Sequence, residues 1–124
     1  MKIALLGTGS VGRALAGRLD GLGHDVVVGT RDPEATLART EPDAMGAPPY
    51  AGWAADHPGV RLATFPDAAA AAELVVNAKN GDGSLEALTA AGAEHLAGKT
   101  LLDIATVLEL LESFGHDDVI DLGA

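Results

Sequence analysis

The chain has 124 residues, of which 48% are apolar and 3% aromatic, and its formal net charge is −10. This length and composition predict one globular domain with a core of alanine, valine and leucine. The negative charge argues against nucleic acid or an anionic membrane surface as a partner. The absence of cysteine excludes disulfides and cysteine-bound metal.

The N-terminal residues begin directly with a strand pattern and lack the apolar segment of a secretion signal. No apolar run approaches the roughly 20 residues that a membrane-spanning helix needs. We therefore expect a cytoplasmic protein with no membrane partner.

A glycine-rich turn follows the first predicted strand, an apolar run at residues 3–6. The turn has the pattern G-x-G-x-x-G and consists of Gly7, Thr8, Gly9, Ser10, Val11 and Gly12. Apolar residues then recur with helical spacing at Val11, Leu15, Leu19 and Leu22. A strand, such a turn and a helix in this order are typical of a dinucleotide site.

Each glycine of the turn has an expected role in such a site. Gly7 allows the tight turn, Gly9 lets the backbone approach a pyrophosphate, and Gly12 lets the helix and strand pack closely. The unpaired N–H groups and the positive dipole end of the helix then face the anion.

The residues after the second predicted strand, 25–29, indicate which dinucleotide is bound. A domain that prefers NAD usually carries an acidic residue here, which binds the ribose 2′-hydroxyl. This chain has Thr30 and Arg31 instead. A hydroxyl and a guanidinium suit a 2′-phosphate, so we expect NADP(H) rather than NAD. The alternative is that Arg31 is an ordinary solvated arginine of a loop.

Strand and helix patterns alternate along the rest of the chain. Asp32 is the expected N-cap of a short helix at 33–39, and residues 41–59 are expected to be irregular apart from a turn of helix around Trp53. Further strands are predicted at 60–64, 74–78, 101–105 and 119–122, with helices at about 66–72, 85–91 and 107–114. This alternation predicts an α/β fold with a doubly wound parallel sheet of the Rossmann type, strand order 3-2-1-4-5-6, in a single domain over 1–124.

The glycine turn, the Thr30-Arg31 pair and the asparagine-containing sequence at 75–81 together resemble one family, the coenzyme F420-dependent NADP oxidoreductases. The resemblance covers residues 1–105 as a family-like core, and 106–124 are expected to add a terminal helix and strand. It implies an NADP-binding domain that transfers a hydride between nicotinamide and a deazaflavin (coenzyme F420), a flavin or another small-molecule acceptor.

The resemblance also implies the residues that hold the cofactor. Gly7, Thr8, Gly9, Ser10, Val11 and Gly12 line the pyrophosphate in such a site. Thr30 and Arg31 hold the 2′-phosphate, and Asn77, Ala78 and Lys79 border the adenosine or nicotinamide ribose. Ile104 and Ala105 end the fifth predicted strand, where the nicotinamide of such enzymes lies.

After Ala105 the chain departs from the family pattern. Relatives continue with an Asn-Pro-type loop and a long segment for the second substrate, whereas residues 111–123 resemble the family's C-terminal region. We therefore expect truncation or an internal deletion, which affects catalysis more than cofactor binding. The main alternative is a catalytically silent NADP-binding module, including one that senses the cofactor as a homodimer. A third hypothesis is a flavodoxin-like nucleotide binder without nicotinamide specificity.

No catalytic residue and no metal site is predicted, because in hydride transfer the cofactor carries the chemistry. Four histidines are scattered without metal-ligand spacing: His24, His57, His95 and His116. Asp103 lies inside an apolar strand, where a structural carboxylate is favoured over a catalytic one. Tyr50 and Trp53 either shield the adenine side of the cleft or, as we favour, pack over the sheet edge.

Overall fold

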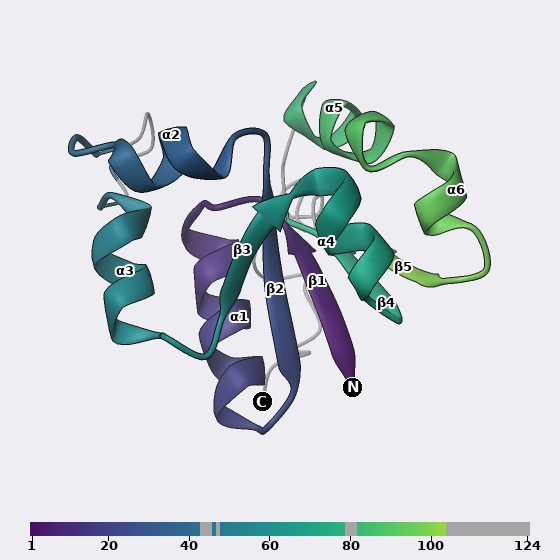
Figure 1. Ribbon diagram of the computed structural model, residues 1–124, viewed down its shortest axis with the longest axis horizontal. Helices are drawn as coiled ribbons and strands as arrows, with labels where there is room; N and C mark the ends of the chain where they lie inside the picture. Colours follow the sequence, from purple (N-terminus) through teal and green to yellow (C-terminus); the bar gives the residue numbers. More distant parts are fainter. Residues whose placement is uncertain (43–45, 47, 79–81, 104–124) are drawn as a thin grey trace, which may run out of the picture.

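Five parallel strands form the sheet at the centre of the computed structural model, which describes residues 1–42, 46, 48–78 and 82–103 (Figure 1). The strands are β1 (Lys2–Leu6), β2 (Asp25–Thr30), β3 (Arg61–Thr64), β4 (Leu74–Asn77) and β5 (Thr100–Asp103). Their order is β3-β2-β1-β4-β5. This confirms the predicted α/β fold and the order of its first five strands. The predicted terminal helix and sixth strand lie outside the described residues.

Strand β1 lies in the middle of the sheet and pairs with β2 on one side and with β4 on the other. The chain places β2 and β3 on the first side and then crosses over to place β4 and β5 on the second. At the carboxyl end of β1, Leu6 pairs with Gly29 of β2 and with Asn77 of β4. The carboxyl ends of the three central strands therefore lie together at one edge of the sheet. A crevice at such a switch point is where doubly wound sheets bind their ligands.

Six helices occur within the described residues. They are α1 (Ser10–Gly21), α2 (Pro33–Ala38), α3 (Tyr50–Asp56), α4 (Phe65–Ala71), α5 (Asp82–Ala91) and α6 (Ala93–Leu96). The sequence did not predict α6. In this part of the chain, no helix has the length and apolar character that crossing a membrane requires.

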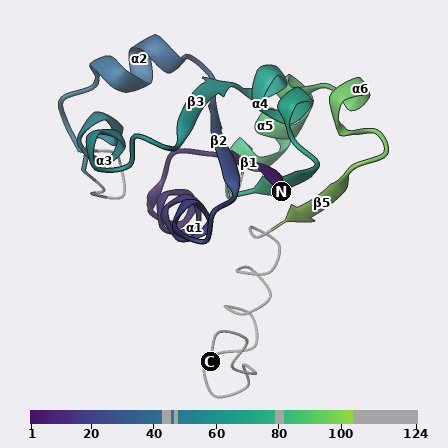
Figure 2. The same ribbon diagram turned by 60° about the horizontal axis from the view of Figure 1, so that its bottom comes forward.

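Helices cover both faces of the sheet (Figure 2). Successive strand residues alternate between two hydrophobic clusters. Ile3 and Leu5 of β1 belong to the cluster with α1 and α3. Ala4 and Leu6 belong to the cluster with α4 and α5. Because side chains of a strand alternate between its faces and both faces are covered, residues 3–6 form an unbroken apolar run.

The buried face of α1 differs from the predicted apolar stripe. Val11 and Leu22, at the ends of that stripe, are 41% and 57% exposed, whereas Gly12 and Ala16 are buried. A helix can approach a sheet closely only where small side chains face it, so Gly12 and Ala16 make the contact. The prediction was therefore wrong for Val11 and Leu22, although the two leucines between them do pack against the core.

Helix α3 contains the turn of helix that the sequence predicted around Trp53 and extends it within a segment otherwise predicted to be irregular. Tyr50, its first residue, is 2% exposed and belongs to the core between α1 and the sheet. The ring of Trp53 packs against the same cluster and stacks on the ring of His57, with centroids 4.1 Å apart. Both aromatic residues therefore pack over the sheet, which agrees with the favoured interpretation.

Burial makes Tyr50 a source of pH dependence. Its hydroxyl finds no hydrogen-bond partner among the described residues. Burial raises the pKa of Tyr50 from 10.0 to about 12, against an opposing contribution from the charge of Arg13. Between pH 10 and pH 12 the unfolded chain loses this proton while the folded chain keeps it. The ionisation of Tyr50 therefore leaves the free energy of unfolding unchanged below pH 10 and lowers it as the pH rises towards 12.

We expect Tyr50→Phe to remove this part of the alkaline destabilisation, which has a limiting slope of about 1.4 kcal/mol per pH unit. Near neutral pH the variant should be as stable as the wild type or more stable, because the lost hydroxyl has no partner. Urea unfolding at neutral pH and above pH 10 measures both effects. Tyr50 is the only tyrosine, so phenolate absorbance reports its ionisation directly. Equal alkaline slopes in the two proteins would contradict the prediction.

Candidate functional site

The glycine turn joins β1 to α1 at the switch point of the sheet. Gly7 has a φ of 125°, which favours glycine, and its N–H donates to the carbonyl of Gly29 at 3.0 Å. A Cβ on Gly12 would lie 2.8 Å from the Gly7 carbonyl oxygen and 3.5 Å from the Cβ of Ala78. Gly7 and Gly12 therefore have the turn and close-packing geometry that the motif predicts.

Gly9 leaves the entrance to α1 open. It is the N-cap residue, and a Cβ built on it would meet nothing within 4 Å. No side chain caps the first N–H groups of α1, and its first turn contains no acidic residue. Unpaired N–H groups and the helix dipole together attract an anion. Ser10 and Val11, both exposed, stand at this helix start.

A polar cavity of about 330 Å³ lies beside the turn, at the carboxyl end of β2. We call it the Arg31 pocket, and its lining consists of Thr8, Thr30, Arg31, Asp32, Ala35, Thr36 and Arg39. The sequence predicted Thr30 and Arg31 for the 2′-phosphate and Thr8 for the pyrophosphate. The structure brings these three together and adds Thr36 and Arg39, which the sequence analysis missed.

Helix α2 positions the wall of the Arg31 pocket. As predicted, the carboxylate of Asp32 caps this helix, accepting a hydrogen bond from the N–H of Ala35 at 3.2 Å. The Oγ1 atoms of Thr30 and Thr36 are 2.9 Å apart, and both residues are buried. In such a pair one hydroxyl donates to the other, and the accepting hydroxyl keeps its own hydrogen for a further acceptor.

The charges of the Arg31 pocket suit an anion. Arg31 and Arg39 are both exposed and line the same cavity, and guanidinium groups bind phosphate through paired hydrogen bonds. Asp32, the acidic residue of the lining, is engaged at the start of α2. Thr36 lies in α2 and Arg39 is its C-cap residue, so the short helix predicted at 33–39 was the signal that could have linked them.

The remaining predicted site residues have different outcomes. The N–H of Ala78 donates to the carbonyl of Leu6 at 3.0 Å, which places Ala78 beside the glycine turn. Asn77 is 0% exposed at the end of β4, so its side chain is enclosed by protein. Lys79, Ile104 and Ala105 lie outside the described residues. Within the described part of the chain, no three histidine, aspartate or glutamate side chains gather to hold a metal.

The sheet order and the glycine turn between β1 and α1 define a Rossmann-type domain. The chain belongs to the family of coenzyme F420-dependent NADP oxidoreductases, whose model matches residues 2–107. This confirms the family that the motifs resemble. Among curated proteins, none matches the chain.

One solved structure shows how much of a longer relative this chain corresponds to. It is the crystal structure of a protein from Arthrobacter sp. FB24, provisionally described as an F420-dependent NADP-reductase. The two share 63% sequence identity with a TM-score of 0.78, over 84% of this chain and 45% of the other. The chain thus spans less than half the length of this relative.

The close contact at Gly12 predicts a large effect of one methyl group. Gly12→Ala should destabilise the fold by about 1–3 kcal/mol, because the added Cβ overlaps a backbone oxygen that cannot move freely. Gly21→Ala, in the same helix, is the matched control, since a Cβ there meets nothing within 4 Å. Urea unfolding of both variants measures the difference. A Gly12→Ala protein as stable as Gly21→Ala would contradict the packing argument.

Proposed function

We propose that this chain binds NADP(H) with the pyrophosphate at the start of α1 and the 2′-phosphate in the Arg31 pocket. The observation that carries this proposal is the pocket itself. Two guanidinium groups and a buried pair of threonine hydroxyls line it, at the strand end where an NAD-binding domain places a carboxylate. Asp32 also lines the pocket, and one of its carboxylate oxygens caps α2.

The residues present fit this cofactor on structural grounds. Gly9 leaves open space at the first N–H groups of α1, so a pyrophosphate can approach the backbone. Thr8 belongs both to the glycine turn and to the Arg31 pocket, so the two anion sites adjoin. A Cβ on Gly12 would lie 3.5 Å from the Cβ of Ala78, so α1 starts beside the residue that follows β4.

If the Arg31 pocket holds the 2′-phosphate, an arginine substitution there should lower the affinity for NADPH but not for NADH. Arg31→Ala should weaken NADPH binding by about 1–3 kcal/mol, the range for a hydrogen bond to a charged group, and barely change NADH binding. Arg39→Ala should act in the same direction. Arg18→Ala is the control for the loss of one positive charge, because Arg18 is exposed in the last turn of α1. Calorimetric titration with both cofactors measures these effects.

The two cofactors differ at the 2′-phosphate, so their comparison isolates that contact. Equal losses of NADPH and NADH affinity in Arg31→Ala would overturn the assignment of the 2′-phosphate to this pocket. A loss in Arg18→Ala as large as that in Arg31→Ala would show that only overall charge matters.

We further propose that hydride transfer is the reaction served by this site, with a deazaflavin, a flavin or a small carbonyl compound as acceptor. Bound NADPH supplies the hydride from its nicotinamide. The chain's own contribution is to hold and orient the cofactor at the crevice between β1 and β4. Family membership supports this proposal. The alternative is a module that binds NADP(H) without turnover.

One variant separates binding from folding in this test. Gly9→Val should remain folded, because a Cβ at this position meets nothing within 4 Å, but should lose NADPH and NADH binding at least about tenfold. We expect the wild-type chain to oxidise NADPH with coenzyme F420, and Gly9→Val not to. NADPH binding by the wild type without turnover on any acceptor class would identify the silent module. Retained affinity in Gly9→Val would place the pyrophosphate elsewhere.

A further inference from the structure

Two hydroxyl groups stand in the wall of the Arg31 pocket at positions where apolar side chains of the same shape would also fit the fold. Val26 and Val28 of β2 belong to the cluster between the sheet and α1. Thr30, two residues further along the strand, points to the same face and is 8% exposed. Valine has nearly the shape of threonine, so the apolar pattern could have continued. Thr36 of α2, 7% exposed, lies opposite with its own hydroxyl.

The fold gains little from this buried pair of hydroxyls. The two Oγ1 atoms are 2.9 Å apart, so each side chain serves as the partner of the other. Loss of one hydroxyl would leave the other without that partner, but replacing both by apolar groups of the same shape is nearly neutral for stability. Both threonines line the cavity that also holds two guanidinium groups. The pair is therefore better explained by what the cavity binds.

The backbone fixes both members of the pair. Thr30 directly follows Gly29, whose carbonyl accepts a hydrogen bond from the N–H of Gly7 at 3.0 Å. The N–H of Thr36 donates to the carbonyl of Asp32, also at 3.0 Å, in the first turn of α2. The hydrogen bond between the two side chains thus joins the end of β2 to α2.

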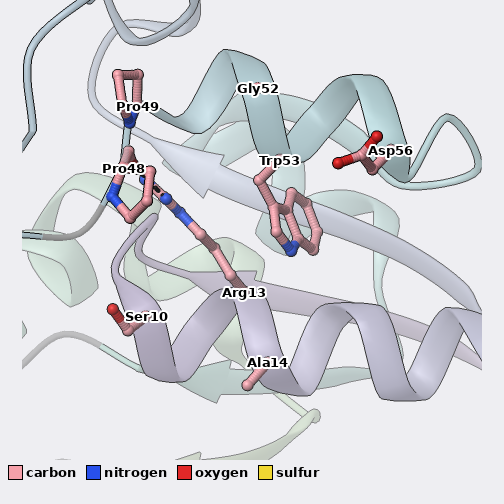
Figure 3. A pocket seen from close by; sticks show the side chains of 8 residues that line it. All are labelled: Ser10, Arg13, Ala14, Pro48, Pro49, Gly52, Trp53 and Asp56. Carbon is pink, nitrogen blue, oxygen red and sulfur yellow. Dashed lines mark hydrogen bonds between the residues drawn. The ribbon is translucent and has the colours of Figure 1, made fainter.

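Thr8, the third threonine of the lining, is held separately. Arg13, 8% exposed, donates from its Nε to the carbonyl of Thr8 at 2.7 Å and from its Nη1 to the carbonyl of Pro48. Arg13 lines another cavity, of about 720 Å³ between α1 and α3, where it extends from α1 towards Pro48 (Figure 3). The glycine-turn side of the Arg31 pocket is therefore held by contacts that do not involve Thr36.

We propose that Thr36 is a positioning residue for recognition of the 2′-phosphate. Its hydroxyl donates to Oγ1 of Thr30, which leaves the O–H of Thr30 for a phosphate oxygen. A hydroxyl that accepts one hydrogen bond is a stronger donor in the next. Thr36 thus raises the preference for NADP(H) over NAD(H) by acting through Thr30. The inference rests on the proposed function, because it requires the 2′-phosphate to lie in the Arg31 pocket.

A double-mutant cycle tests this role. Thr30→Val, Thr36→Val and the double variant are titrated with NADPH and NADH by calorimetry. Thr36→Val should lower NADPH affinity about three- to tenfold, and Thr30→Val at least as much. The double variant should lose no more than Thr30→Val alone, because Thr36 acts only through Thr30. NADH affinity should change less than about twofold in all three, and Thr36→Ser, which keeps the hydroxyl, should bind NADPH within about twofold of the wild type.

Thr40→Val is the matched control, because Thr40 is exposed and does not line the pocket. Urea unfolding should show the double variant to be about as stable as the wild type. A merely structural role would lower NADPH and NADH affinity equally in Thr36→Val, which would refute the proposal. Additive losses from Thr30→Val and Thr36→Val would also refute it, since they would show that Thr36 contacts the phosphate itself.

Arg31→Ala separates a failure of this inference from a failure of the proposed function. If Arg31→Ala loses the preference for NADPH and Thr36→Val keeps it, the 2′-phosphate lies in the Arg31 pocket and Thr36 has no part in its recognition. If neither variant loses that preference, the 2′-phosphate does not lie in this pocket, and both proposals are wrong.

Discussion

The contact between Gly12 and the carbonyl of Gly7 is the constraint on which the rest of the site depends. Because only a glycine fits where a Cβ would lie 2.8 Å from that oxygen, α1 starts close against the carboxyl end of β1. The same turn is tied to β2 through the N–H of Gly7 and lies beside Ala78 after β4. One close approach thus brings the ends of three strands and the positive end of a helix to a single crevice.

The electrostatics of the site are local. With a net charge of −10, the chain repels a polyanionic cofactor at long range, so binding has to come from groups within about one Debye length, roughly 8 Å at physiological salt. The fold concentrates such groups after β2 and at the start of α1. Asp32 opposes them with a negative charge in the same lining, and one of its oxygens accepts a hydrogen bond from the N–H of Ala35.

The parts of the structure that the sequence could predict are those set by local patterns. Apolar runs and the glycine motif were enough for the strand order and for the roles of Gly7 and Gly12. The helical spacing of Val11 and Leu22 did not show which face of α1 needs small residues. The four prolines in residues 41–59 left only one turn of α3 predictable, the one around Trp53. The place of Arg39 in the pocket depends on the direction in which α2 runs, which the sequence does not show. Arg13 gave no signal, because a charged residue in an amphipathic helix is expected to face solvent.

The hydrogen bond between Thr30 and Thr36 has a consequence for the state of the protein before and after a ligand arrives. Either hydroxyl can be the donor, so the pair has two proton arrangements with the same heavy-atom positions. An anion that accepts from one of them selects a single arrangement, in which both O–H bonds point along one chain towards the charge. The wall of the pocket would then respond to its ligand by polarity alone, with no movement of the backbone.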